Sequence, residues 1–235
     1  MALSGIEAAL RDLDASSSPA IVRFDAGPEP AGRVAVLPSA FNPPTWAHLH
    51  LLDVGLSVEG VTSSAALLTT RNVAKEVFGA GLADRVAMLL AVQQQRPALA
   101  ILATNVARLI DQAAALRAWR PAVDFDLIVG YDTLVRLFDA HYYADMPSEL
   151  RPFFERHRVI ATNRGQHGVD AVAAFLQRPD ARPFAPAILV RELDDHPASL
   201  SSTAARDDVA RGEHPSALPP EVVDYIRAHG LYAGD

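Results

Sequence analysis

The sequence predicts an α/β protein with a doubly wound, mostly parallel sheet. Short apolar runs alternate with longer segments of helical periodicity, and these segments are long enough to connect parallel strands. Because such crossovers are right-handed, they place helices on both faces of the sheet. The expected strands are 20–24, 33–37, 64–68, 99–103, 125–129, 158–161 and 187–190.

The expected helices occupy the intervals between these strands and the two ends of the chain. Residues 1–14 have apolar positions at helical spacing and lack the basic start and apolar run of a secretion signal. Residues 27–32 contain two prolines and two glycines, which predicts a turn that pairs 20–24 with 33–37 as a hairpin. The other expected helices are 47–56, 82–94, 106–119, 132–138, 148–155, 170–177, 202–211 and 220–229.

Composition narrows the classes of function. A formal net charge of −7 argues against a general nucleic-acid or anionic-membrane surface, so we expect neither partner. The absence of cysteine excludes disulfides, thiolate nucleophiles and cysteine metal sites, and the expected location is cytoplasmic. The length fits a single domain over residues 1–235 and leaves open whether it forms a homo-oligomer.

The first motif lies where the strand 33–37 gives way to a helix. Pro43 and Pro44 disfavour helix before them and leave Thr45 to cap the next helix, whose first amides lack internal partners. An anion there would meet those amides, the helix dipole, the Thr45 hydroxyl and the His48 imidazole. The segment therefore predicts a phosphate site. The structural alternative is a proline-rich turn beside a half-buried histidine.

The second motif is the segment from Ser199 to Arg206. Hydroxyl residues, among them Ser202 and Thr203, stand at the start of an expected helix, and Arg206 lies one turn inside it. Capping groups, free amides and a guanidinium fork together suit phosphate oxygens. An ordinary capped helix with an exposed arginine fits the same residues.

The third motif ends the apolar strand 125–129. Gly130 lets the backbone approach a ligand, and Asp132 at the next helix start can accept hydrogen bonds from ribose hydroxyls. An aspartate cap after a turn glycine is the structural alternative.

Asn72 and Lys75 follow the strand 64–68 and should lie at the same sheet edge as His48, where they suit the phosphate of a second substrate. Lys75 is the only lysine among 21 basic residues, which favours a role for its compact charge.

Aromatic and metal-binding side chains allow fewer conclusions. Trp46 and Trp119 can stack on a pyridine or adenine ring, or pack in the core. His48 and His50 are two residues apart and face different sides of a helix, unlike a zinc pair, so no protein metal site is expected.

The first motif resembles a superfamily of nucleotidyltransferases. In that family a loop after the first strand ends in His or Thr, any residue, Gly and His, and Phe41 to His48 reads FNPPTWAH. Ala47 replaces the glycine, a departure that eukaryotic nicotinamide-nucleotide adenylyltransferases also tolerate. Ser39 and Ala40 stand where the family usually has a glycine and a hydroxyl residue.

The C-terminal region narrows this resemblance. The segment PPEVVDYIRAHGLY, ending at Tyr232, looks very like the ending of nicotinate and nicotinamide mononucleotide adenylyltransferases. Arg85 and Met88 resemble an Arg-x-x-Met pairing of these enzymes. The resemblance covers about residues 33–232, which leaves 1–32 as an N-terminal extension.

The resemblance implies a Rossmann-like enzyme that transfers AMP from ATP to nicotinamide or nicotinate mononucleotide, with Mg²⁺ held by substrate phosphates and water. The implied catalytic groups are His48, Thr45 and Arg206. The implied ATP contacts are Ser39, Ala40, Phe41, His48, Gly130, Asp132, Ser202, Thr203 and Arg206. The implied contacts of the mononucleotide are Asn42, Asn72, Lys75, Arg85, Trp46 and Trp119.

Two other functions stay open at this point. The phosphate motifs also suit a nucleotidyltransferase that acts on another phosphorylated acceptor. The departures at Ser39, Ala40 and Ala47 also suit a non-catalytic nucleotide-binding scaffold.

Overall fold

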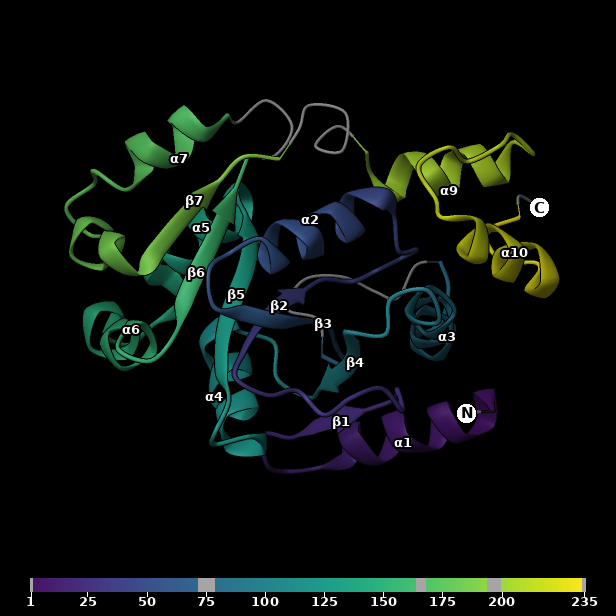
Figure 1. The fold of residues 1–235 in the computed structure, drawn as a ribbon, viewed down its shortest axis with the longest axis horizontal. Helices are drawn as coiled ribbons and strands as arrows, with labels where there is room; N and C mark the ends of the chain where they lie inside the picture. Colours follow the sequence, from purple (N-terminus) through teal and green to yellow (C-terminus); the bar gives the residue numbers. More distant parts are fainter. Residues whose placement is uncertain (1, 72–78, 164–167, 194–199, 234–235) are drawn as a thin grey trace.

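The computed structural model describes residues 2–71, 79–163, 168–193 and 200–233, and its centre is a seven-stranded sheet (Figure 1). The strand order is β1-β4-β3-β2-β5-β6-β7, and every pairing is parallel except that of β1 with β4. The α/β doubly wound class is therefore confirmed. The strands are β1 Ile21–Arg23, β2 Arg33–Pro38, β3 Val61–Thr69, β4 Leu99–Thr104, β5 Asp124–Gly130, β6 Arg158–Thr162 and β7 Ile188–Arg191.

Helices cover both faces of the sheet, and each face has its own apolar core. None of the described helices is both long and apolar enough to cross a membrane. One face carries α1 Leu3–Ala15, α2 Trp46–Leu56, α3 Leu82–Gln93, α9 Ser202–Ala210 and α10 Pro220–His229. The other carries α4 Leu109–Trp119, α5 Tyr131–Leu137, α6 Met146–Phe154 and α7 Val169–Phe175, with the short 3₁₀ helices η1 Ala140–Tyr142 and η2 Arg182–Ala187.

The expected hairpin between the first two strands is wrong. β1 pairs antiparallel with β4, not with β2, and so lies at the edge of the sheet. Side chains fix this pairing: Asn105 accepts from the Ala20 amide at 2.9 Å, and Asp25 accepts from the Ile101 amide at 2.7 Å. The glycine- and proline-rich segment 27–32 therefore crosses from the sheet edge to the central strand β2 instead of closing a tight turn.

The strand order reverses at β2, which has β3 on one side and β5 on the other. Residues 34–37 of β2 are buried because helices cover both faces, which explains their unbroken apolar character. In open sheets of this kind ligands bind beyond the carboxyl ends of the strands at such a reversal. The loops that leave β2 and β5 at this edge contain the first and third motifs.

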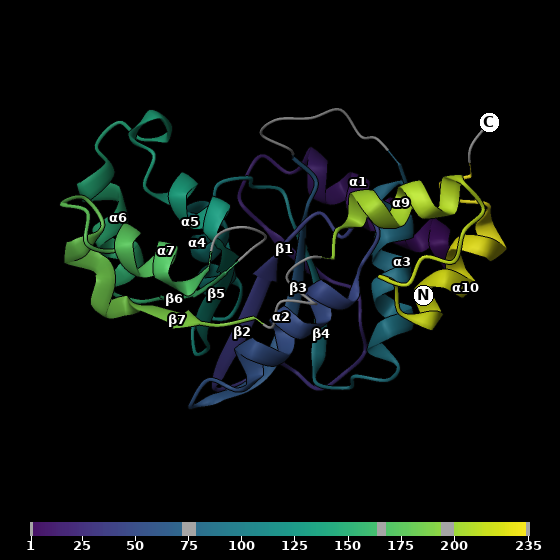
Figure 2. The ribbon, with the colours of Figure 1, turned by 90° about the horizontal axis from the view of Figure 1, so that it is seen from above.

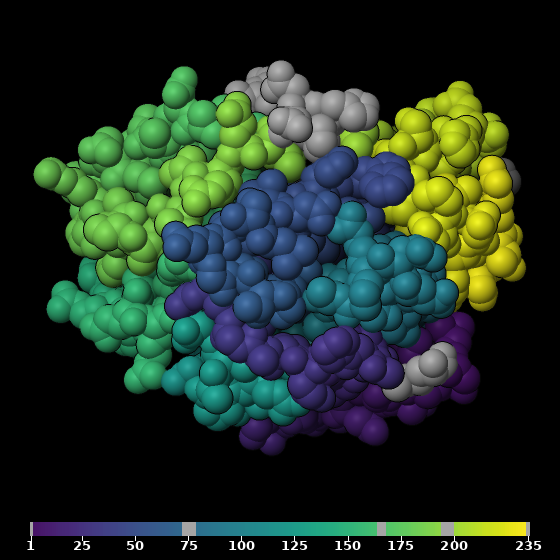
Figure 3. All heavy atoms as spheres, in the orientation of Figure 1, coloured from purple at the N-terminus to yellow at the C-terminus, as the bar shows by residue number. Residues whose placement is uncertain are grey.

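The C-terminal helices belong to the same side of the molecule as α3. Figure 2 shows α9 and α10 beside α3, at the opposite end from α6 and α7, and α10 packs against α3. In the space-filling view the C-terminal segment lies directly against the residues around α2 and α3 (Figure 3). The last part of the chain is thus brought to the helix that begins with the first motif.

Candidate active site

His48 lies in the first turn of α2, and its ring is held on both nitrogens. The backbone N–H of Thr45 donates to Nδ1 at 3.0 Å, and the Thr45 hydroxyl lies 2.8 Å from the same nitrogen. Because a backbone N–H can only donate, Nδ1 is the acceptor and the ring proton sits on Nε2. Nε2 lies 3.0 Å from the Ser39 hydroxyl and therefore donates to it. The fold thus presents one imidazole N–H toward the carboxyl end of β2.

The loop before α2 is fixed by burial and by a bent backbone. Phe41 is fully buried with φ of +44°, and its ring centroid lies 4.8 Å from that of His48. The Asn42–Pro43 peptide is cis, and the Trp46 amide donates to the carbonyl of Ala217 at 2.9 Å. These contacts hold the N-terminus of α2 against the C-terminal region.

The second motif docks directly on this loop. The Ser202 hydroxyl donates to the carbonyl of Pro43 at 2.9 Å, and the Arg206 guanidinium donates to the carbonyl of Asn42 at 2.6 Å. Arg206 also lies 3.2 Å from the Thr203 hydroxyl. Two segments about 160 residues apart in the chain, each predicted to bind phosphate, therefore share one site. Ser199, at the start of the motif, lies outside the described residues.

The last described residues of the chain pack against the same loop before α2. The Tyr232 hydroxyl donates to Asn42 Oδ1 at 2.7 Å, and burial raises the pKa of Tyr232 to about 12. Gly79 has φ of +89°, and a Cβ there would lie 2.9 Å from the Tyr232 ring and 3.0 Å from Asn42 Oδ1. Only a glycine fits between these groups without displacing them.

Arg85 points into this corner from α3. Its Nε donates to the carbonyl of Ala80 at 2.8 Å, and only 6% of the residue is exposed. Burial lowers the pKa of Arg85, and the positive charge of Arg206 lowers it further. Two guanidinium groups close enough to influence each other form a positive corner beside the Asn42 loop, which suits an anionic ligand.

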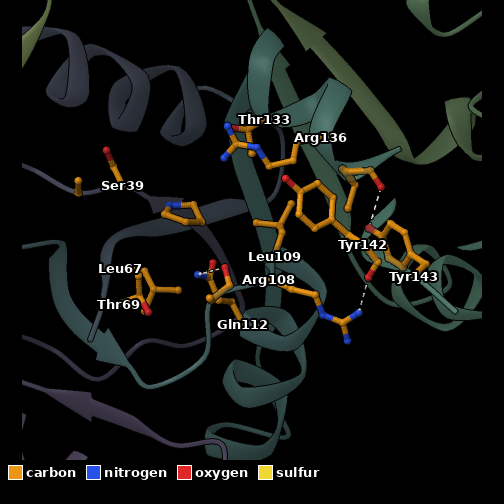
Figure 4. Close-up of a pocket in the computed structure, with 14 residues that line it drawn as sticks. Ser39, Leu67, Thr69, Arg108, Leu109, Gln112, Thr133, Arg136, Tyr142 and Tyr143 are labelled. Atoms are coloured by element: carbon orange, nitrogen blue, oxygen red, sulfur yellow. Dashed lines mark hydrogen bonds between the residues drawn. The ribbon is translucent and has the colours of Figure 1, made fainter. Parts of the chain in front are cut away.

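A cavity of about 220 Å³ opens on the other side of Ser39 (Figure 4). It lies at the carboxyl ends of β2 and β3, against α4, α5 and η1. Its lining residues are Pro38, Ser39, Ala40, Leu67, Thr69, Ala107, Arg108, Leu109, Gln112, Thr133, Arg136, Leu137, Tyr142 and Tyr143. Ser39 therefore connects the cavity to His48, since its hydroxyl contacts the ring.

Two tyrosines form one wall of the cavity. Figure 4 shows the Tyr142 ring on the cavity side, below Arg136. The Tyr143 hydroxyl donates to the carbonyl of Leu137 at 2.7 Å, and burial raises its pKa to about 12. A half-buried aromatic ring at the cavity wall suits stacking against a flat heterocycle.

The third motif reaches the same edge. Gly130 ends β5 and precedes α5, and its φ of −79° is an ordinary extended value. Asp132 is exposed in the first turn of α5, while Thr133, the next residue, lines the cavity. Because β5 pairs with β2, this turn lies next to the loop that contains Ser39.

Several predicted contacts are placed differently from expectation. Trp119 ends α4 beyond the opposite ends of the strands, where Arg120 stacks on its ring at 4.5 Å, so it does not reach the site.

Other predicted contacts are near the site or not described. The Ser39 amide donates to the carbonyl of Leu67 at 3.1 Å within the sheet, which leaves the Ser39 hydroxyl as the group that faces the site. Asn72 and Lys75 lie outside the described residues. Trp46 is half-buried at the start of α2.

Sequence reasoning missed the residues that line the cavity from α4, α5 and η1. The available signal was the aromatic pair Tyr142-Tyr143 one short helix beyond the Gly130-x-Asp132 motif. No sequence motif marks Gln112, Arg108 or Arg136. They line the cavity only because the loops after three strands meet in the folded protein.

Comparisons with known proteins identify relatives over most of the chain, although no family model matches. A protein of Anaeromyxobacter dehalogenans named "Probable nicotinate-nucleotide adenylyltransferase" is 33% identical over 86% of this chain and 97% of its own length. A protein of Schizosaccharomyces pombe named "Putative nicotinamide mononucleotide adenylyltransferase" is 26% identical over 83% and 84%. The fold matches that of Plasmodium falciparum nicotinic acid mononucleotide adenylyltransferase complexed with NaAD, with a TM-score of 0.65, 14% identity and coverage of 85% and 97%.

Proposed function

Because the chain belongs to the nicotinate-nucleotide adenylyltransferase family, we propose that it transfers AMP from ATP to a pyridine mononucleotide and releases pyrophosphate. The observation that carries this function is the docking of α9 on the loop before α2. Through Ser202 and Arg206 it joins two phosphate-binding segments around His48. Such a double site suits a reaction in which two phosphorylated substrates meet.

The 5′-phosphate of the mononucleotide attacks the α-phosphorus of ATP, the new P–O bond forms, and the bond to pyrophosphate breaks. The attacking phosphate is already ionised near neutral pH, so no general base is needed. The protein has to align the two phosphates and stabilise the negative charge that develops. In this proposal the Nε2–H of His48 donates to a phosphate oxygen, in the position that the Ser39 hydroxyl takes now.

Arg206, Ser202 and Thr203 contact the phosphates of ATP, and Asp132 accepts from its ribose. Arg85, which the resemblance implies as a contact of the mononucleotide, lies beside Arg206, so this proposal assigns it instead to the positive corner at the ATP phosphates. Mg²⁺ held by the ATP phosphates and water would neutralise part of the charge on the leaving pyrophosphate. As a hard ion that keeps several waters, it requires few protein oxygens. The described residues hold no group of three or more His, Asp or Glu side chains suited to a metal, and the proposed binding mode needs none.

The cavity beside Ser39 takes the pyridine ring of the mononucleotide. Its volume, its aromatic wall and its position at the strand-order reversal support this assignment. From the cavity the 5′-phosphate extends past Ser39 to His48, while ATP occupies the α9 side.

Pyrophosphate release from ATP with nicotinamide mononucleotide, nicotinate mononucleotide and other phosphorylated acceptors tests the proposal, with CTP in place of ATP as the control. We expect release with ATP and a pyridine mononucleotide only. Release with another acceptor or with CTP would identify a different nucleotidyltransferase. ATP binding without release with any acceptor would identify a scaffold.

A further inference from the structure

Gln112 carries an unused hydrogen-bond acceptor at the cavity. The residue lies in the first turn of α4 and is 5% exposed. Its Nε2 group donates to the carbonyls of Val106 at 3.3 Å and Ala107 at 3.2 Å. Because carbonyls only accept, the NH₂ group must face them and Oε1 must face away. Figure 4 shows the side chain rising from α4 between Thr69 and Leu109.

Oε1 of Gln112 is buried and has no hydrogen-bond partner among the described residues. A buried amide oxygen without a donor is costly, and native proteins leave few such groups unsatisfied. Since Gln112 lines the cavity, a ligand there can supply the missing donor.

The two arginines that line the cavity, Arg108 and Arg136, are poorly placed to pair with a carboxylate on a ligand. Arg108 donates twice to Asp111, at 2.8 and 3.0 Å, and also to Glu149 at 3.1 Å and to the Tyr142 carbonyl at 3.0 Å. Two carboxylates therefore balance its charge, and its donors point away from the cavity. Arg136 stands at the rim with an exposed side chain, where solvent weakens its field.

We propose that the cavity selects a pyridine mononucleotide whose ring bears a carboxamide over one whose ring bears a carboxylate, and that Gln112 is the specificity-determining residue. This inference rests on the proposed function. A carboxamide has an N–H donor for Oε1. A carboxylate has only acceptors at neutral pH, so it leaves Oε1 unpaired and brings a negative charge beside it.

The test compares kcat/KM for nicotinamide mononucleotide with kcat/KM for nicotinate mononucleotide at saturating ATP, followed by pyrophosphate release. The wild-type protein should favour the amide by about tenfold or more, because the acid leaves a buried polar group unpaired. Each ratio comes from one protein preparation, so any inactive fraction cancels.

Two substitutions at Gln112 should move the ratio in opposite directions. Gln112→Met keeps the length of the side chain but removes the acceptor, so the ratio should fall toward one. Gln112→Glu keeps an acceptor and adds negative charge, so the ratio should rise. As a matched control, Arg136→Met removes the rim cation and should leave the amide favoured.

A wild-type preference for the acid, or a ratio that neither Gln112 substitution moves, would overturn the inference while leaving the proposed function intact. If no acceptor supports pyrophosphate release, the proposed function fails instead. Calorimetric titration of the wild-type and Gln112→Met proteins with each mononucleotide then tests the preference directly. Tighter amide binding that Gln112→Met abolishes would support it, and any other result, including no binding of either, would overturn it.

Discussion

At the residue scale, one backbone hydrogen bond decides the chemistry of His48. The Thr45 N–H occupies Nδ1, which places the ring proton on Nε2 and makes the residue a hydrogen-bond donor toward the site. The sequence predicts that Thr45 caps the helix and that His48 lies one turn inside it, but not that the two side chains form a capping box. It does not reveal the contact with Ser39, which depends on how the loop after β2 turns back over the start of α2.

We expect His48→Ala to lower kcat about 100-fold, as the loss of one transition-state donor does. The substitution also removes a capping partner of α2, which should cost about 1 kcal/mol of unfolding free energy. Pyrophosphate release and a thermal melt measure the two effects separately. His50→Ala, on the same helix but outside the site, is the matched control and should keep normal turnover. Normal turnover in His48→Ala would remove the residue from the mechanism.

At the element scale, α9 contributes to the site through its docking on the loop before α2. Arg206 donates to the carbonyl of Asn42 at 2.6 Å and lies 3.2 Å from the Thr203 hydroxyl, so its guanidinium is held beside this loop. Periodicity predicts the seven strands of the sheet and the core of each described α-helix, but not the short 3₁₀ helices η1 and η2. It cannot predict the edge pairing of β1 with β4. That pairing depends on Asp25, just after β1, which accepts from the Ile101 amide, and on Asn105, just after β4, which accepts from the Ala20 amide.

Arg206→Ala should raise the KM for ATP about tenfold or more and lower kcat, because a charged donor to the phosphates is lost. Arg211→Ala is the matched control. Arg211 follows the same helix, is exposed, and pairs with Asp208 and Glu213. Steady-state kinetics with varied ATP distinguish the two variants. Equal kinetics in both would mean that Arg206 only anchors the loop or merely covers the surface.

The close approach of α2 to the sheet gives a second prediction at this scale. A Cβ at Gly55 would lie 2.7 Å from the Cβ of Ala35 and 2.7 Å from Cδ1 of Ile128. Alanine normally stabilises a helix relative to glycine, but here overpacking should destabilise the protein by about 1–3 kcal/mol. It should also lower turnover, because α2 carries His48.

Urea denaturation of Gly55→Ala, Ile128→Val and the double variant measures this packing. Ile128→Val removes one clashing methyl group, so the double variant should be less destabilised than the sum of the single variants. Strict additivity would show that α2 does not press on Ile128.

At the scale of the whole molecule, a buried group of ion pairs and the proposed active site lie at opposite ends of the strands. Asp126, near the start of β5, has a fully buried side chain and accepts from Arg33 at 2.8 Å and from Arg158 at 2.5 Å. The proposed catalytic groups lie beyond the other ends of the strands. The sequence predicts the active edge because its motifs follow strands. The cavity walls at Gln112 and Tyr142 escape prediction, since their convergence depends on tertiary packing alone.

Asp126→Asn should lower the unfolding free energy by about 2–3 kcal/mol, less than for a fully buried pair because both arginines are partly exposed. The KM for ATP should stay unchanged. Urea denaturation and kinetics on the same preparation check both statements. A large change in KM without a loss of stability would mean that the two edges are coupled.

The transfer of AMP is tested most directly by following the label from ATP. With ATP labelled in the α-phosphate and a pyridine mononucleotide, we expect the label to appear in a dinucleotide. With ATP labelled in the γ-phosphate, we expect the label in pyrophosphate and none in the acceptor. Label from the γ-phosphate in the mononucleotide or in free orthophosphate would rule out AMP transfer, because the protein would then be a kinase or an ATPase.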